Sequence, residues 1–196
     1  MVIDHLQEKL KRTPNHEGLA FFYCRRTWGE EERSRPLSVL QSFLRQLACY
    51  LGKPGLIQSG LVKAVEEKNR VGGSFTRTTC EALLLESFNL YPCTTLVIDA
   101  LDECDSASRD ELVEFLGNVG TRASKPVKIF ISSRPDDDIK GRFFSGLNIG
   151  VDANITREDM RLFIDQRLQG MTKKNPAIAR FKDKISAELF AKCDGM

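Results

Sequence analysis

The stretch from Thr95 to Glu103 restricts the possible fold more than any other part of the chain. It reads Thr-Leu-Val-Ile-Asp-Ala-Leu-Asp-Glu. Its first four residues show no polar alternation, which is typical of a strand buried on both faces of a parallel sheet. Three carboxylates then follow within five positions, at Asp99, Asp102 and Glu103. Because ligands collect at the carboxyl ends of parallel strands, this ending predicts both a sheet type and a candidate site.

Other apolar runs of strand length alternate with helical segments. Leu19–Cys24 and Val127–Ser133 are predicted strands, and Leu147–Val151 is a weaker fourth. Helical periodicity and capping signals predict helices over about 2–12, 36–51, 56–69, 78–90, 108–119, 139–144, 156–168 and 176–192. The stretch 170–176 is the only one that resembles a linker. This alternation predicts an α/β fold with a mainly parallel sheet.

The composition excludes several classes of protein. With 41% hydrophobic and 29% charged residues, the chain has the composition of a soluble globular domain. Its 29 basic and 27 acidic residues nearly balance, so charge favours neither nucleic acid nor a membrane surface as a partner. No apolar run approaches the roughly 20 residues of a membrane-spanning helix. Six cysteines without a CxxC pair, and only two histidines, argue against zinc and favour reduced thiols in a cytoplasmic protein.

The acidic end of the central strand supplies candidates for metal and water chemistry. Asp99 is its last residue, where a carboxylate can hold Mg²⁺ directly or through water. Asp102 and Glu103 follow closely, and one of them is predicted to orient or deprotonate an attacking water. The structural alternative is that these acids only stabilise the start of the next helix, and for Asp105 that interpretation is preferred.

The next predicted strand also ends in polar residues, Ser132, Ser133 and Arg134. Arg134 is predicted either to contact a γ-phosphate or to form a structural ion pair with Asp102 or Glu103, and residue chemistry alone does not decide between them. The aspartates at 136–138 are interpreted as the solvated N-terminus of a helix rather than a metal cluster. No Gly-x-x-x-x-Gly-Lys-Ser/Thr phosphate loop occurs in the 196 residues.

Four segments, in order, resemble the NACHT domain of STAND-type P-loop NTPases, in particular the fungal NACHT and nephrocystin-like N-terminal group. Leu96–Glu103 is similar to the extended Walker B segment, and Ile129–Pro135 resembles the sensor 1 strand. Phe21–Cys24, with the helix that starts at Pro36, resembles the second strand and its following helix. Ala187–Met196 is similar to a motif in the helical region that follows the core.

The resemblance implies a three-layer, P-loop NTPase-like parallel sheet that lacks its first strand. Residues 1–152 would form a partial nucleotide-binding core, and 153–196 would begin the helical region. In this family the first strand and its phosphate loop precede the helix that residues 2–12 resemble, so the chain is expected to be truncated before the Walker A loop. One side of the sensor 1 strand would then be left unpaired, unless the strand at 147–151 closes the gap.

The resemblance also implies roles and partners. Asp99 takes the Mg²⁺ role, Asp102 and Glu103 activate water, and Ser133 and Arg134 contact the nucleotide. The implied cofactors are ATP and Mg²⁺, but the chain alone is not expected to bind them because the phosphate cradle is missing. Implied partners are an effector domain upstream, ankyrin or WD repeats downstream, and further copies of the chain.

Three hypotheses about function follow. The first is a partial NTPase module from a nucleotide-dependent oligomerising switch in signal transduction. The second is a non-catalytic remnant or interaction module that does not bind nucleotide. The third, a different α/β hydrolase, is the weakest because no nucleophile is paired with a base. The sequence therefore leaves open whether the chain has enzymatic activity.

Overall fold

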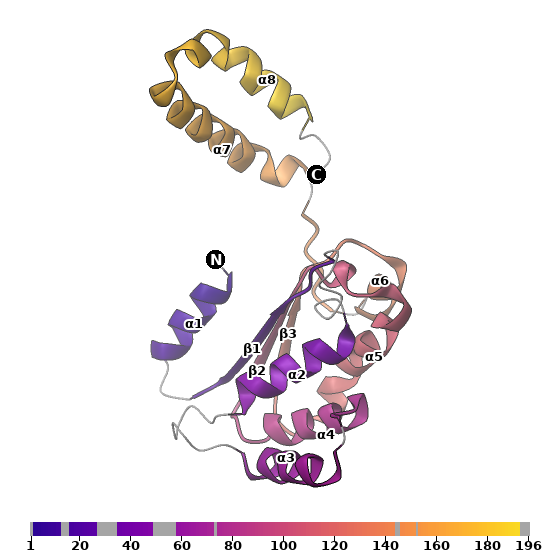
Figure 1. The fold of residues 1–196 in the computed structure, drawn as a ribbon. Coiled ribbons are helices and arrows are strands. Elements are labelled where there is room, and N and C mark those ends of the chain that lie inside the picture. The colour runs from indigo at the N-terminus through magenta and orange to yellow at the C-terminus, as the bar shows by residue number, and fades with distance from the viewer. Residues whose placement is uncertain are drawn as a thin grey trace. The chain divides into compact units, whose positions relative to one another are not determined.

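A computed structural model of the chain describes residues 2–12, 16–26, 35–48, 58–72, 74–143, 146–151 and 153–192 (Figure 1). The chain divides into two compact units, 1–145 and 146–196, each described by itself below. The assignment of 1–152 and 153–196 as core and helical region stays a prediction.

The first unit alternates strands with helices. In chain order it contains α1 (Val2–Arg12), β1 (Gly18–Tyr23), α2 (Pro36–Leu47), α3 (Ser59–Val71), α4 (Arg77–Phe88), β2 (Thr94–Asp99), the 3-10 turn η2 (Leu101–Glu103), α5 (Ser106–Arg122), β3 (Val127–Ile131) and α6 (Asp137–Phe143). The second unit contains α7 (Ala153–Lys174), the 3-10 helix η3 (Pro176–Phe181) and α8 (Lys182–Lys192).

The three strands form one parallel sheet with β2 in the centre, in the order β1-β2-β3. Tyr23 at the end of β1 lies opposite Asp99, and Ile98 lies opposite Ile131 near the end of β3. The carboxyl ends of all three strands therefore meet at one edge of the sheet. The predicted α/β class and parallel pairing are confirmed.

The main core lies on one face of this sheet. Ala20, Leu96 and Ile98 point into it and are fully buried, and α2, α4 and α5 supply the helical side. Strand alternation directs the intervening residues to the other face. On that face Tyr23 and Phe130 are about half exposed. Asp99 belongs to the same alternation, so its carboxylate points away from the core.

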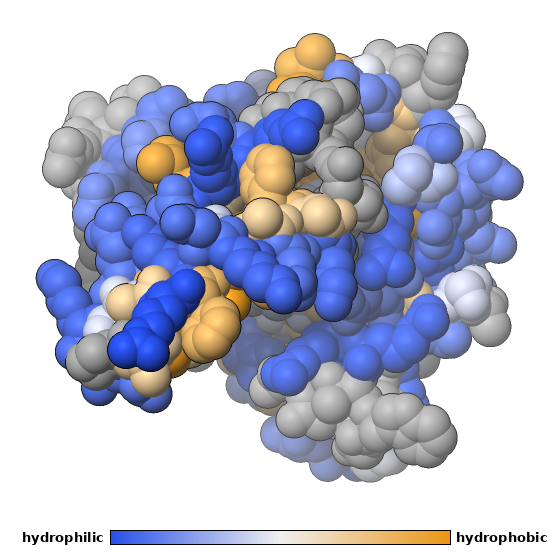
Figure 2. Space-filling view, turned by 90° about the horizontal axis from the view of Figure 1, so that it is seen from above, coloured by the Kyte–Doolittle hydropathy of each residue, from blue (hydrophilic) through white to orange (hydrophobic). Residues whose placement is uncertain are grey.

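Most of the surface drawn in Figure 2 is hydrophilic, and apolar residues gather there in a few groups. None of the described helices combines the length and the apolar content that are required to span a bilayer.

Gln46 of α2 occupies the outer edge of β1. Its side-chain oxygen accepts a hydrogen bond from the Phe21 N–H at 3.0 Å, and its amide nitrogen donates one to the Phe21 carbonyl at 2.7 Å. The side chain thus pairs with the strand much as a neighbouring strand would. It satisfies edge groups that would otherwise be open to pairing with another chain.

Replacing Gln46 with alanine is expected to lower the free energy of unfolding by about 1–2 kcal/mol, because two part-buried backbone groups lose their partner. The measurement is equilibrium unfolding in denaturant. Gln41→Ala is the matched control, since Gln41 is an exposed glutamine of the same helix, and it should change the free energy by less than about 0.5 kcal/mol. Equal losses in the two variants would contradict the edge-pairing role.

Two helices begin slightly before their predicted starts, α4 by one residue and α5 by two. α4 begins at Arg77, and the hydroxyl of Thr76 accepts the N–H of Thr79 at 3.2 Å. α5 begins at Ser106 behind Asp105, not at Ser108. The Ser108 hydroxyl instead donates to the Asp105 carboxylate at 2.8 Å, inside the first turn. Each helix begins early because a capping residue type already stands upstream of the predicted start.

The predicted strand at Leu147–Val151 is also wrong. This segment has no regular structure, and Leu147, Ile149 and Val151 are 93%, 77% and 73% exposed. An alternating apolar pattern becomes a strand only when a partner supplies hydrogen bonds, and no strand of the described residues pairs with this one.

The helices of the second unit differ from prediction mainly in length. α7 begins before Thr156 and continues through Gly170 to Lys174, so the predicted linker at 170–176 is largely helical. Together η3 and α8 cover the predicted helix over 176–192, whose first turns are 3-10. The predicted helix ends at 49–51 and 144, and the C-terminal motif residues 193–196, lie outside the described residues.

Candidate functional site

The site begins at Asp99, the exposed last residue of the central strand. Its carboxylate accepts a hydrogen bond from the Ser132 hydroxyl, which in turn accepts the N–H of Ala100 at 3.0 Å. The Ser132 backbone bonds to Ile98 and Leu101 at 2.9 and 3.0 Å. Ser132 therefore extends the pairing of β2 with β3 past the strand ends and fixes the position of the Asp99 carboxylate.

Ala100 turns the chain sharply after Asp99. It adopts φ 55° and ψ 52°, a left-handed conformation that costs a residue with a side chain roughly 1–2 kcal/mol. The turn η2 follows directly, and it places Asp102 and Glu103 at the carboxyl edge of the sheet. Strain at this position is retained because the backbone on both sides is hydrogen-bonded.

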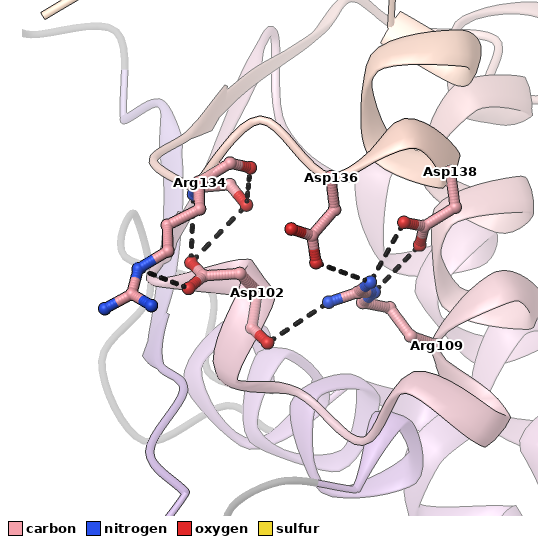
Figure 3. Close-up of polar contacts among 6 residues, drawn as sticks. Asp102, Arg109, Arg134, Asp136 and Asp138 are labelled. Atoms are coloured by element: carbon pink, nitrogen blue, oxygen red, sulfur yellow. Dashed lines mark hydrogen bonds and ion pairs between the residues drawn. The ribbon is translucent and has the colours of Figure 1, made fainter.

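Asp102 holds the loop that follows β3. Its carboxylate accepts the N–H of Arg134 at 3.1 Å and the Ser133 hydroxyl at 3.5 Å, and the Arg134 Nε lies 3.5 Å from Oδ2 (Figure 3). The side chain of Asp102 is 13% exposed, whereas that of Arg134 is 83% exposed. The predicted ion pair between Arg134 and Asp102 is therefore present. The terminal guanidinium nitrogens of Arg134, however, point away from the other residues drawn in Figure 3.

Glu103 connects the same turn to the end of β1. Its Oε2 atom accepts the N–H of Arg26 at 2.9 Å, and nearby the N–H of Cys24 donates to the Asp99 carbonyl at 2.9 Å. Every predicted site residue thus lies at the carboxyl edge of the sheet. Asp99 and Ser132 form one contact group, and Asp102, Ser133 and Arg134 form a second.

Arg109 of α5 is the residue that sequence reasoning missed. Its side chain is only 4% exposed and bonds Asp138 at 2.8 and 2.9 Å, Asp136 at 2.9 Å and the Asp102 carbonyl at 3.1 Å (Figure 3). Burial opposes its charge, but hydrogen bonds and charge from Asp138 and Asp136 raise its pKa above the ordinary value. The predicted helix N-terminus at 136–138 is confirmed by α6, but Asp136 and Asp138 are not only solvated, because both also pair with Arg109.

The donor set fits Mg²⁺ only in part. Among the described residues, no three His, Cys, Asp or Glu side chains converge on a point that could hold a metal. Mg²⁺, however, usually keeps several waters and binds through one or two carboxylates together with substrate phosphates. The exposed Asp99 carboxylate, with Ser132 on one oxygen, suits that mode of binding.

The fold and site together define the class of protein. It is an α/β protein with a three-stranded parallel sheet, and it carries acidic and basic side chains at the carboxyl edge of that sheet. Within that class, residues 1–134 match the family described as Nephrocystin 3, N-terminal, and the chain belongs to this family. The match includes all three strands and every predicted site residue. No curated protein and no solved structure matches the chain. The nephrocystin-like part of the expected resemblance is confirmed.

Proposed function

We propose that this chain forms the metal- and water-binding side of a NACHT-type NTPase site, within a nucleotide-dependent switch for signal transduction. The observation that supports this most is the Asp99 carboxylate, which is exposed at the end of the central strand and oriented by Ser132. In this role Asp99 binds Mg²⁺, which when bound neutralises charge on the phosphates of ATP. The P-loop NTPase-like fold is part of the same proposal.

Arg134 and Glu103, which lie near Asp99 at the same edge of the sheet, take the other two roles, phosphate contact and orientation of the water. Asp102 fixes the Arg134 backbone and Nε, so the terminal nitrogens of Arg134 extend into solvent where a γ-phosphate can be contacted. Glu103 is held through Oε2 by a single backbone N–H. Its carboxylate therefore keeps capacity to accept from a water, and we assign it the water-orienting role.

The phosphate cradle comes from residues other than these. Binding the β- and γ-phosphates requires backbone N–H groups at a helix N-terminus and a lysine, and the 196 residues hold no such motif. An effector domain, ankyrin or WD repeats, and further copies of the chain belong to this proposal as partners.

The chain alone is expected to bind a non-hydrolysable ATP analogue with a Kd weaker than about 10 µM in the presence of Mg²⁺, equivalent to less than about 7 kcal/mol of binding free energy. Titration calorimetry on the folded chain measures this. A tighter Kd would contradict the division of the site into two parts, because phosphate binding would then be complete within these residues.

A second candidate function is a non-catalytic interaction module. It is favoured by one observation, namely that Asp102 and Glu103 already accept hydrogen bonds from the backbone of Arg134 and Arg26. Under this alternative the acidic turn serves to tie the strand ends together. It predicts that replacing Asp99 with asparagine has no effect on nucleotide hydrolysis.

A further inference from the structure

The second unit has a surface groove that the proposed function does not use. It lies along η3 and the first turns of α8, which follow one another directly after the chain leaves α7 (Figure 1). The groove has a volume of about 510 Å³ and is lined by Ala177, Ile178, Phe181, Lys184, Ile185 and Glu188. All six residues belong to η3 and α8, so one face of this helical segment forms the groove.

The groove is mainly apolar and remains open to solvent. Ile178 and Ile185 are partly buried, whereas Phe181 is 59% exposed. The contact of α8 with α7 uses other side chains, since the Ser186 hydroxyl donates to the Asp165 carboxylate at 3.5 Å. A contiguous apolar surface with polar residues at its rim is typical of a site of interaction with another molecule.

The positive charge of the chain is concentrated around this groove. From Lys173 to Glu188 there are five basic residues and two acidic ones, a net charge of +3, although the whole chain has only +2. Lys184 lines the groove and is exposed, and Glu188 lines it one turn further along α8. Charge complementarity therefore calls for a mainly acidic partner.

Two classes of partner combine acidic charge with apolar surface, namely an anionic membrane and an acidic amphipathic helix. A membrane-binding helix inserts an apolar ridge between the lipids. Here the apolar surface is recessed, with Ile178 and Ile185 partly buried, and Glu188 would face the lipid phosphates. A helix that places apolar side chains in a groove meets neither obstacle, so the shape favours a protein partner.

We propose that the groove on η3 and α8 binds an acidic amphipathic helix of a partner protein. Apolar side chains one turn apart on that helix pack against Ile178, Phe181 and Ile185. Acidic side chains beside them face Lys184, and a basic side chain faces Glu188. This interaction goes beyond the proposed nucleotide site and does not depend on it.

The test is fluorescence anisotropy of a labelled synthetic peptide titrated with the whole chain. The peptide has about 15 residues, long enough to form a helix, with leucines at helical spacing on one face and glutamates on both flanks. We expect a Kd of about 100 µM or tighter. A peptide with lysines in place of the glutamates should bind at least about tenfold more weakly. Equal affinity for the two peptides, or no binding of the acidic one at about 1 mM chain, would overturn the proposal.

A matched pair of variants locates the binding. Phe181→Ala should weaken the acidic peptide at least about fivefold, because it removes the largest apolar side chain of the groove. Phe163→Ala is the control, since Phe163 is 58% exposed on α7 and does not line the groove. It should change the Kd by less than about twofold. Equal weakening by the two variants would contradict binding in the groove.

A charge variant keeps the test decisive if Phe181→Ala fails to fold. Lys184→Glu should weaken the acidic peptide at least about fivefold, whereas Lys63→Glu, an exposed lysine of the first unit, should change the Kd by less than about twofold. Two other occupants would overturn the proposal. One is binding to phosphatidylserine vesicles that depends on Phe181, and the other is dimerisation that depends on Phe181, each without binding of the peptide.

Discussion

Replacing Arg109 with alanine is expected to lower the free energy of unfolding by about 3 kcal/mol. Removing one partner from a buried ion pair typically costs about 3–5 kcal/mol, because the remaining charge stays desolvated without compensation. The lower end applies here because the Asp136 and Asp138 side chains are 43% and 29% exposed, so water recovers part of the loss. The Asp102 carbonyl also loses a donor.

Equilibrium unfolding in denaturant measures this loss. Arg70→Ala is the matched control, since Arg70 is 77% exposed in a helix of the same unit and pairs with Glu67 at 3.5 Å. It should change the free energy by less than about 0.5 kcal/mol. A similar small loss for Arg109→Ala would mean that its ion pairs contribute no more than surface pairs do.

A further variant separates charge from packing. Adding Asp136→Asn and Asp138→Asn to Arg109→Ala removes the two uncompensated carboxylates. We expect this triple variant to recover roughly 1–2 kcal/mol of the lost free energy, because leaving a charge unpaired is worse than removing both partners. If it recovers nothing, the effect of Arg109→Ala comes from the lost volume of its side chain.

The sheet could be predicted because its strands carry the information locally. Leu19–Cys24 is a continuous apolar run, and shorter apolar runs stand at 96–98 and 129–131. Such runs are typical of strands in a parallel sheet, although on the second face of this sheet Tyr23 and Phe130 remain about half exposed. Parallel pairing then brings Asp99 and the 132–134 residues to one edge, as the observed register does. The site could be located from these ends without any knowledge of side-chain contacts.

The network around Arg109 could not be predicted in this way, although a signal was present. Arg109 lies in helical register with Leu112, Val113 and Leu116, which form the buried face of α5. An arginine on such a face must find carboxylates. The sequence could not show which ones, because 136–138 also has the local pattern of a helix N-terminus. The contact depends on how the loop after β3 returns to α5.

The segment 147–151 shows the opposite case, because its local pattern predicts a strand but no described strand pairs with it. Leu147, Ile149 and Val151 alternate as a strand should, yet they remain exposed. Strand formation needs a neighbour as well as a pattern, whereas helices such as α7 satisfy their backbone internally. This difference explains why the predicted helices generally formed and the weakest predicted strand did not.

The largest expected effect on activity concerns Asp99. In a polypeptide that carries a Gly-x-x-x-x-Gly-Lys-Ser/Thr segment ahead of residue 1, Asp99→Asn is expected to reduce kcat for ATP hydrolysis by at least about 100-fold, or roughly 2.7 kcal/mol. Asparagine keeps the shape of the side chain and can still accept from Ser132. It lacks the negative charge that binding Mg²⁺ requires, so the metal-dependent step is the one that fails.

The control for this variant is Asp105→Asn. Asp105 is also an exposed acid beside the turn, at the N-cap position of α5, and its carboxylate accepts a hydrogen bond from the Ser108 hydroxyl rather than from the helix backbone. It should leave kcat within about twofold of the unsubstituted protein, which corresponds to less than about 0.5 kcal/mol. Far-UV circular dichroism of each variant confirms that the fold is retained.

The dependence on Mg²⁺ separates the two candidate functions. If Asp99 binds the metal, Asp99→Asn raises the Mg²⁺ concentration needed for half-maximal hydrolysis as well as lowering kcat, and Asp105→Asn changes neither. Hydrolysis that is equal in the Asp99→Asn and unsubstituted proteins would overturn the metal role. Absence of hydrolysis in the unsubstituted protein, with nucleotide still bound through the added phosphate loop, would favour the interaction module. In that case Asp102 and Glu103 act only through their bonds to Arg134 and Arg26.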